Sequence, residues 1–331
     1  MDSHELLCRL QKTGRIRSLE ATAVALAGGV SSAIWLVTDG SERFVVKRAL
    51  PKLKVRDDWF ADTARNSVEH DCLAWLDRIA RGSVPRILFH DVEAALFGME
   101  FLDERFANWK GELLRGVARE EDAARAAKLM ATIHATSWVD SEVQTRFQTW
   151  PTFFALRAEA YLVVTGSRHP KLKSLFDEEA ERLGRTALAL THGDFSPKNI
   201  LISRERLVLL DCEAAWFGDP AFDTAFLLNH LFLKALHLPA WRENYLRLAF
   251  VCWSEYGASL ADRFDGSLRS RIGRLLLMLM LARIDGKSPV EYIVEQQKKE
   301  LVRDFVGRML PAGAFAMEEI TDKWRRTLAM Q

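Results

Sequence analysis

Hydrophobic and polar residues follow two different patterns along this chain. In the first hundred residues, strand-like apolar runs occupy 21–27, 33–38, 43–49, 86–91 and 94–102. The turn sequence Asp-Gly-Ser-Glu separates the second run from the third, which is typical of a hairpin. The stretch 60–80 has a helical period instead, with Val68, Cys72, Trp75, Leu76 and Ile79 on one face. The pattern predicts an antiparallel five-stranded sheet with one inserted helix.

From about residue 104 the period becomes that of long amphipathic helices, as in 119–138. Two short strands and a loop interrupt it near 191–211, and helices resume after Pro220. The most apolar run, 275–282, is far shorter than the roughly 20 residues of a membrane span, so we expect a core helix. The predicted class is α+β, with an N-terminal domain at 1–102 and a larger, mainly helical domain at 103–331.

Composition narrows the function classes. The 331 residues include 46 basic and 45 acidic ones, a net charge of +1, so no overall field attracts nucleic acid or a membrane surface. A small-molecule partner is expected. The four cysteines are scattered without a CxxC pair, and residues 1–20 lack the apolar block of a signal peptide, which together favour a cytoplasmic protein with reduced thiols. No feature indicates an oligomeric state.

Three polar side chains carry the candidate chemistry. Asp194 lies in a loop, Asn199 directly precedes an apolar strand, and Asp211 ends the next one. A loop carboxylate can accept or orient a hydroxyl proton, while an amide oxygen and a rigidly held carboxylate suit Mg²⁺ bound together with phosphates. An ordinary turn with capping residues is the alternative, but the spacing favours phosphoryl transfer. Glu213 is either a second metal ligand or an orienting group.

The segments "HGDFSPKN" and "LLDCEAAWFGDPAFD" resemble the catalytic loop and the metal-binding segment of aminoglycoside phosphotransferase and choline kinase-like small-molecule kinases. The resemblance implies a bilobal protein kinase-like fold, with ATP between a sheet-rich N-lobe and a helical C-lobe. It implies that Asp194 is the catalytic base and that Asn199 and Asp211 hold Mg²⁺. Asp219 and Asp223, in the second segment, are expected to cap the next helix and brace the loop.

The N-terminal residues offer the remaining parts of such a kinase. Gly28 and Gly29 lie between two strands, where bare backbone can approach phosphates, although they lack the GxGxxG spacing and also fit a hairpin turn. Lys47 is the only charge inside an apolar strand, and a buried ammonium requires an anion. We expect ATP phosphates and Glu69 to provide it. The alternative is an outward-pointing Lys47 and a solvated Glu69.

The adenine is expected to meet the segment between the lobes. In these kinases backbone groups of that segment bind the adenine edge, so the resemblance assigns main-chain hydrogen bonds to Glu100, Phe101 and Leu102.

Two departures from protein kinases favour a small acceptor. Gly193 stands where those enzymes carry Arg, and only eight residues separate Asp211 from Pro220, too few for a peptide-docking segment. Protein kinases also carry a lysine shortly after the catalytic Asp, and here the lysine of this loop, Lys198, lies at a different distance from Asp194. We hypothesise that it offsets the charge of the transferred phosphoryl group, against the alternative of a solvated loop lysine. A pseudokinase scaffold without turnover is the competing function.

The C-terminal helices bear on the acceptor. Residues 219–331 contain 14 acidic and 16 basic residues, without the carboxylate excess that polycationic aminoglycosides require. A sugar-like compound or an amino alcohol with a free hydroxyl is expected instead. Arg283 and Asp285 are equally consistent with substrate contact and with an interhelix ion pair. Ser288 and Pro289 are expected to begin a helix, and Trp216 is a core residue or part of the acceptor pocket.

Overall fold

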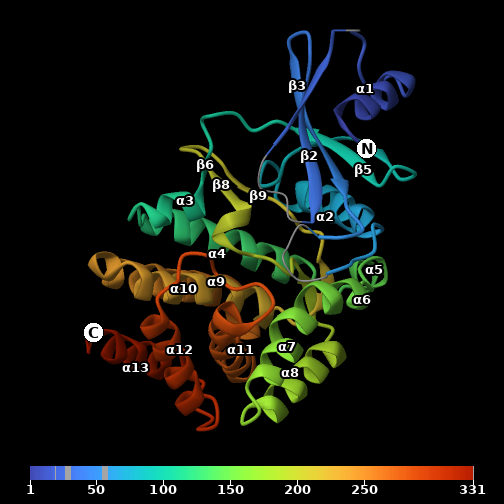
Figure 1. Ribbon diagram of the computed structural model, residues 1–331. Helices are drawn as coiled ribbons and strands as arrows, with labels where there is room; N and C mark the ends of the chain where they lie inside the picture. The colour runs from blue at the N-terminus through green and yellow to red at the C-terminus, as the bar shows by residue number, and fades with distance from the viewer. Residues whose placement is uncertain (19, 27–30, 54–58, 331) are drawn as a thin grey trace. The chain divides into compact units, whose positions relative to one another are not determined.

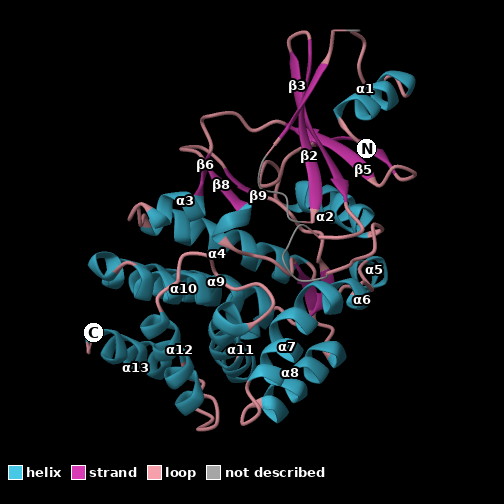
Figure 2. Ribbon diagram, in the orientation of Figure 1, coloured by secondary structure: helices cyan, strands magenta, loops and turns pink. Residues whose placement is uncertain are grey.

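The computed structural model describes residues 1–18, 20–26, 31–53 and 59–330, and the chain divides into two units, Met1–Phe106 and Ala107–Gln331 (Figure 1). The domain boundary after residue 102 that the sequence suggests stays a prediction. An antiparallel sheet in unit 1 and helices in unit 2 (Figure 2) give the α+β class that the sequence predicts.

Unit 1 is built on a five-stranded sheet of order β1-β2-β3-β5-β4, in which every neighbouring pair is antiparallel. Its elements are α1 (Ser3–Lys12), β1 (Thr22–Ala25), β2 (Ser32–Asp39), β3 (Glu42–Ala49), α2 (Arg65–Ile79), β4 (Ile87–Asp91) and β5 (Leu96–Glu100). All five strands and α2 lie where the apolar pattern predicts them. The central strand β3 pairs with β2 and β5, which fixes the register of Lys47 opposite Ile34 and Phe97.

Helix α1 was not predicted. Asp2 and Glu5 form a capping box, and each accepts a hydrogen bond from the other's backbone amide. Leu6 and Leu10 are buried in a cluster with residues of β2 and β3, including Trp35. Only two leucines of this segment are fully buried, and most of its other residues are polar or charged. The apolar stripe is therefore too narrow for the sequence pattern to indicate a helix.

Unit 2 is mainly helical, with two small sheets. Its first half contains β6 (Ala107–Asn108), α3 (Trp109–Leu114), α4 (Glu120–Thr136), α5 (Ser141–Arg146), α6 (Trp150–Phe153), the π-helix η1 (Phe154–Val163), α7 (Val164–Arg168) and α8 (Lys173–Arg185). Then follow β7 (Ala189–Thr191), the 3₁₀ turn η2 (Pro197–Asn199), β8 (Ile200–Ile202), β9 (Leu207–Leu209) and β10 (Trp216–Gly218). The chain ends with α9 (Ala221–His237), η3 (Pro239–Trp241), α10 (Arg242–Leu260), η4 (Ala261–Arg263), α11 (Gly266–Asp285), α12 (Gln296–Met309) and α13 (Met317–Ala329).

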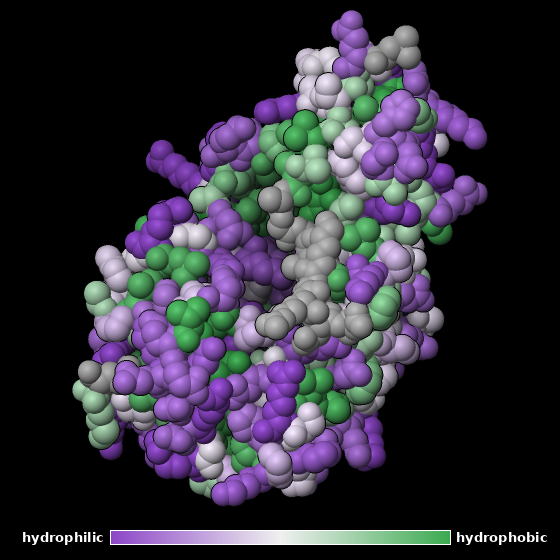
Figure 3. Space-filling model, in the orientation of Figure 1, coloured by the Kyte–Doolittle hydropathy of each residue, from purple (hydrophilic) through white to green (hydrophobic). Residues whose placement is uncertain are grey.

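The core of unit 2 surrounds α9 and α11, which pack against each other. The apolar run 275–282 lies within α11 and is fully buried, as the sequence predicts. On the face shown in Figure 3, side chains of unit 2 are mostly hydrophilic with small, separate apolar patches. Among the described residues, none of the helices has the length and apolarity needed to cross a membrane.

The segment after α11 differs from its prediction. Ser288 and Pro289 do not begin a helix, because the next helix, α12, starts only at Gln296. The guanidinium of Arg283 instead donates hydrogen bonds to the backbone carbonyl and to the hydroxyl of Ser288. With its carbonyl and hydroxyl engaged by α11, Ser288 is held in a turn rather than at a helix start.

Candidate active site

The loop that carries Asp194 follows β7 and depends on a glycine. Gly193 has φ +78°, and a Cβ at this position would lie 2.5 Å from the carbonyl oxygen of Ala214. Both the positive φ and this close approach exclude a side chain. The departure from the protein kinase pattern at Gly193 therefore has a local steric cause.

His192 and Asp223 hold the loop from inside. The backbone amides of His192 and Gly193 donate to the two carboxylate oxygens of Asp223, over 2.6 and 2.9 Å. The His192 ring contacts the Leu210 carbonyl through Nε2 at 3.1 Å, while Nδ1 accepts from the Asp194 amide. Burial lowers the pKa of His192, which fits a neutral ring that donates through Nε2. Asp223 thus braces the loop, as the sequence predicts.

Asp219 lies one residue before Pro220, the N-cap of α9. Its carboxylate accepts from the backbone amide of Ala221, the first residue of α9, at 3.0 Å. It also pairs with Arg182 at 2.5 Å and with Arg271 at 2.9 Å. Asp219 therefore ties the start of α9, which carries Asp223, to α8 and α11, although it is not the N-cap residue itself.

Two cations lie beside the Asp194 carboxylate. Arg157 of η1 places Nη2 at 2.9 Å from Oδ2, and Lys198 places Nζ at 3.3 Å from the same oxygen. Arg157 also donates from Nε to the Gly193 carbonyl, at 2.6 Å. Burial alone would raise the pKa of Asp194, but the charges of Lys198 and Arg157 hold this pKa below its usual range. Asp194 is therefore ionised at neutral pH although it is only 4% exposed.

A hairpin brings the two expected metal ligands to one end of a small sheet. Strands β8 and β9 pair with Ile200 opposite Leu209, and the Leu210 amide donates to the Asn199 carbonyl at 2.8 Å. Asp211 follows immediately, with φ +66°. The side-chain Nδ2 of Asn199 donates to the backbone carbonyl of Asp194 at 3.0 Å. The side-chain oxygen of Asn199 is therefore the atom that can bind a metal. An amide oxygen and a carboxylate oxygen are hard donors that fit a divalent cation such as Mg²⁺.

Glu213 lies near the same charges. It is buried, with 4% of its surface exposed. Burial would lower the pKa of Arg157, but Asp194, Glu213 and Asp211 all act to raise it, and the pKa is raised overall. Asp194 is bonded to this guanidinium directly, while Glu213 and Asp211 act on it through their charge.

In unit 1, β3 and α2 bring Lys47 and Glu69 together. The Nζ of Lys47 lies 2.7 Å from Oε1 of Glu69, and both residues are buried. The alternative of an outward lysine and a solvated glutamate does not hold. Gly28 and Gly29 lie outside the described residues.

The segment expected to meet adenine ends the sheet of unit 1. Glu100 is the last residue of β5 and pairs with Phe44, while Phe101 and Leu102 follow without regular structure. The guanidinium of Arg43 lies 4.6 Å from the centroid of the Phe101 ring. This contact fixes one side chain and leaves the role of the backbone groups a prediction.

Arg283 and Asp285 have different surroundings in the structure. Asp285 forms an ion pair between helices, because its carboxylate accepts two hydrogen bonds from Arg303 of α12, at 2.7 and 2.8 Å. It also contacts His169. Arg283 lines a cavity that Asp194 also lines. Trp216 is not among the residues of that cavity and stacks on Phe153 in the core, with ring centroids 3.7 Å apart.

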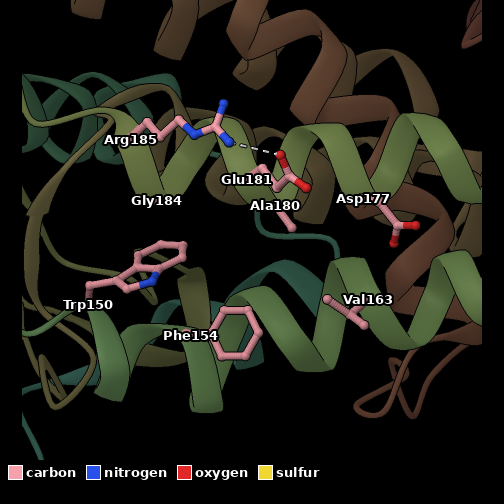
Figure 4. Close-up of a pocket in the computed structure, with 8 residues that line it drawn as sticks. All are labelled: Trp150, Phe154, Val163, Asp177, Ala180, Glu181, Gly184 and Arg185. Carbon is pink, nitrogen blue, oxygen red and sulfur yellow. Dashed lines mark hydrogen bonds and ion pairs between the residues drawn. The ribbon is translucent and has the colours of Figure 1, made fainter.

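A larger groove of about 450 Å³ lies between η1 and α8 (Figure 4). Trp150 and Phe154 face α8 across it, and Arg185 pairs with Glu181 on α8 itself, at 3.1 Å. None of the predicted site residues that the structure describes lines this groove. The candidate site is therefore the smaller cavity at Asp194.

Sequence reasoning missed Arg157 and Lys234. Arg157 comes from a π-helix, a rare element that is often found at functional sites, and no motif surrounds it. Lys234 lies in α9, lines the cavity at Asp194 and is completely buried. Its signal was available, since it is a lone charge in the apolar run Leu231–Leu236, the same pattern that drew attention to Lys47.

The comparisons with known proteins identify the family. Residues 22–258 match the phosphotransferase enzyme family, and the chain belongs to that family. Methylthioribose kinases are among its relatives. The one from Pectobacterium atrosepticum is 24% identical over 274 residues, 72% of this chain and 68% of the relative. The one from Escherichia coli O45:K1 is 25% identical over 246 residues, 65% of this chain and 58% of the relative. The chain thus spans 58 to 68% of the length of these two enzymes.

Solved structures show that the fold is protein kinase-like. An aminoglycoside phosphotransferase from Alicyclobacillus acidocaldarius has a TM-score of 0.53 at 16% identity, over 97% of this chain and 96% of its own. A choline/ethanolamine kinase family protein from Mesorhizobium loti has a TM-score of 0.54 at 13% identity, over 98% and 97%. With its family membership, the chain is a small-molecule kinase, an enzyme class that uses ATP and typically a divalent metal.

Proposed function

We propose that the chain transfers the γ-phosphoryl group of ATP, as its Mg²⁺ complex, to a hydroxyl of a small sugar-like molecule. The observation that carries the proposal is the ionised, buried Asp194, held between Arg157 and Lys198 on a loop fixed by Asp223. A carboxylate kept charged inside a cavity can orient a hydroxyl and take its proton. The names of the methylthioribose kinase relatives support a sugar-like acceptor.

The proposed reaction assigns each atom. The acceptor oxygen attacks the γ-phosphorus, its O–H bond breaks, and the proton passes to Asp194. The bond from the γ-phosphorus to the bridging oxygen breaks, and ADP leaves with that electron pair. Lys198 stabilises charge on the transferred group. Mg²⁺, when bound, neutralises phosphate charge, and Asn199, Asp211 and Glu213 are its proposed ligands.

The nucleotide contacts remain assigned to the N-terminal domain at 1–102, and catalysis and acceptor binding to 103–331. We propose that Lys47, oriented by Glu69, contacts ATP phosphates, as the corresponding pair does in kinases. Gly28 and Gly29 are proposed to approach the phosphates, and the backbone of Glu100, Phe101 and Leu102 to bind adenine. A cytoplasmic location is proposed from the unpaired thiols, three of which are buried.

The test is acceptor-stimulated release of ADP from ATP and Mg²⁺ by the purified full chain. A panel of sugars, amino alcohols and aminoglycosides provides the acceptors, and Asp194→Asn is the matched inactive variant. We expect stimulation by at least one sugar-like acceptor, with loss of about 100-fold or more in the variant. Nucleotide binding with no Asp194-dependent turnover on any acceptor would favour the scaffold function over this proposal.

A further inference from the structure

The cavity at Asp194 is small and lies entirely within unit 2. Its free volume is about 50 Å³, and it is lined by Ser196 beside Asp194, Lys110 of α3, Lys234 of α9, Arg283 of α11 and Tyr292. That volume has room for roughly one or two water-sized groups. The cavity therefore fits one end of an acceptor rather than a whole sugar ring.

The charges lining this cavity do not cancel. Lys110 pairs with Glu291, and Lys198 pairs with Asp194. Lys234 and Arg283 remain, and no carboxylate among the described ion pairs is bonded to either of them. Two cations with neutral partners thus line this cavity.

The contacts of Lys234 are weak for a buried ammonium. Its Nζ lies 3.5 Å from the carbonyl oxygen of His230 and 4.9 Å from the centroid of the Tyr292 ring, and its side chain is completely buried. Arg283 is better held, by the Ser288 carbonyl and by the Tyr161 hydroxyl at 3.3 Å. A buried cation is normally retained only with an anion, so Lys234 indicates an absent negative partner.

Three further donors line the same cavity without a partner. Within the described part of the chain, the Ser196 hydroxyl, the Tyr292 hydroxyl and the Nε of Arg283 are buried and make no hydrogen bond. Each can donate, and Arg283 cannot accept. Buried polar groups normally have a partner, which is protein, ordered water or a ligand. Unpaired donors and cations are therefore gathered on the residues that line this cavity, a composition that suits an oxygen-rich anion.

We propose that this cavity binds a carboxylate of the acceptor, so that the preferred substrate is a small hydroxy acid or sugar acid rather than a neutral sugar. The inference rests on the proposed kinase function, because it assumes that the acceptor binds beside Asp194. A carboxylate suits the small volume better than a phosphate ester, and its two oxygens match the two cations, Lys234 and Arg283, that have only neutral partners. The sequence led us to expect a sugar-like compound or an amino alcohol, and the positions of Lys234 and Arg283 redirect that expectation toward an acid.

The acid–base properties of Lys234 agree with this role. Burial, with the charges of Lys110 and Arg283, lowers the pKa of Lys234 to about 7, while Glu291 acts in the opposite direction. Burial also keeps the neighbouring His230 neutral by lowering its pKa. A carboxylate in contact with Lys234 would favour its charged form.

Binding is tested by calorimetry on the full chain carrying Asp194→Asn, which prevents turnover. The probes are matched pairs of an acid and its neutral alcohol: glycerate with glycerol, ribonate with ribitol, and gluconate with glucitol. We expect at least one acid to bind about tenfold or more tightly than its partner, a difference that one charge-assisted contact supplies. Ribose 5-phosphate is included to compare a phosphate ester with ribonate. If no acid binds better than its neutral partner, or if the phosphate ester is preferred, the carboxylate assignment is overturned.

Variants locate the binding. Lys234→Met should abolish the preference for acids, Arg283→Gln should weaken it, and Lys171→Met, the same change at an exposed position, should leave it intact. A preference that survives both cavity variants overturns the proposal, and either variant suffices if the other does not fold. Turnover by the wild-type chain is followed with the same pairs. Phosphorylated neutral alcohols without acid binding would refute only the carboxylate site, whereas acid binding without any turnover would refute only the kinase function.

Discussion

The guanidinium of Arg157 lies 2.9 Å from the carboxylate of Asp194 and also bonds the backbone carbonyl of Gly193. One buried side chain thus fixes the charge and the position of the proposed base. This contact joins two residues that are 37 positions apart in the sequence, and no sequence motif predicts it.

Arg157→Met should shift the pH dependence of turnover. Asp194 has a lowered pKa and is active when ionised, so activity is lost as pH falls through that pKa. Without Arg157 the cost of burying Asp194 is less well offset, so its pKa rises. The acid limb of kcat/KM should therefore move to higher pH. Arg185→Met, at an exposed ion pair, is the control, and identical acid limbs in all three proteins would contradict the role of Arg157.

Asp223→Asn should loosen the catalytic loop. Asp223 accepts from the amides of His192 and Gly193, and an asparagine offers one oxygen and one donor to the same two donors. We expect a loss of about 1–3 kcal/mol in the free energy of unfolding, together with lower kcat. Denaturant unfolding and initial rates measure both effects. Asp262→Asn, at an exposed position of unit 2, is the matched control, and equal stability of the two variants would argue against the brace.

Asp211→Asn should weaken the proposed metal site. Loss of one carboxylate charge lowers the attraction for a hard divalent cation. The Mg²⁺ concentration for half-maximal turnover should rise by at least about tenfold, because even the loss of a residue that only contacts a metal ligand weakens metal binding by that factor. A Mg²⁺ titration at fixed ATP measures this, again with Asp262→Asn as control. An unchanged Mg²⁺ requirement would remove Asp211 from the ligand set.

Lys234→Met should stabilise the chain near neutral pH. The pKa of Lys234 is lowered from 10.5 to about 7, so between these values the unfolded chain keeps a proton that the folded chain has lost. Wild-type stability should therefore rise with pH in this window relative to the variant. The variant should be more stable at pH 7 by on the order of a few kcal/mol, and its advantage should shrink towards pH 10.

Thermal unfolding of both proteins from pH 7 to 10 measures that difference. Lys110, Arg283, His230 and Glu291 face Lys234 and are present in both, so their titration largely cancels. If the difference in Tm between the two proteins does not change with pH, the pKa of Lys234 is not lowered by folding, and the prediction is wrong.

Much of the fold and of the loop chemistry followed from local sequence. The strands of unit 1 have their own apolar pattern, and Asp194, Asn199 and Asp211 are close in sequence, so a loop and a hairpin suffice to gather them. The pairing of Lys47 with Glu69 was inferred because a lone charge in an apolar strand requires a partner.

The parts that were missed depend on distant segments. Arg157 reaches Asp194 from a π-helix, and Lys234 becomes a cavity residue only through the packing of α9 beside α11. Pro289 offered a helix start, but local hydrogen bonds from Arg283, five residues before Ser288, override this preference. Packing, rather than pattern, also decides that Trp216 belongs to the core.

Transfer of labelled phosphate tests the central claim most directly. The full chain is incubated with ATP labelled at the γ-phosphoryl group, Mg²⁺ and the acceptor that best stimulates ADP release, and the products are identified by mass spectrometry. The account predicts one labelled phosphate ester of the acceptor for each ADP formed, and about 100-fold or more slower formation with Asp194→Asn. ADP formed without an ester, or ester formed equally well by Asp194→Asn, would contradict it.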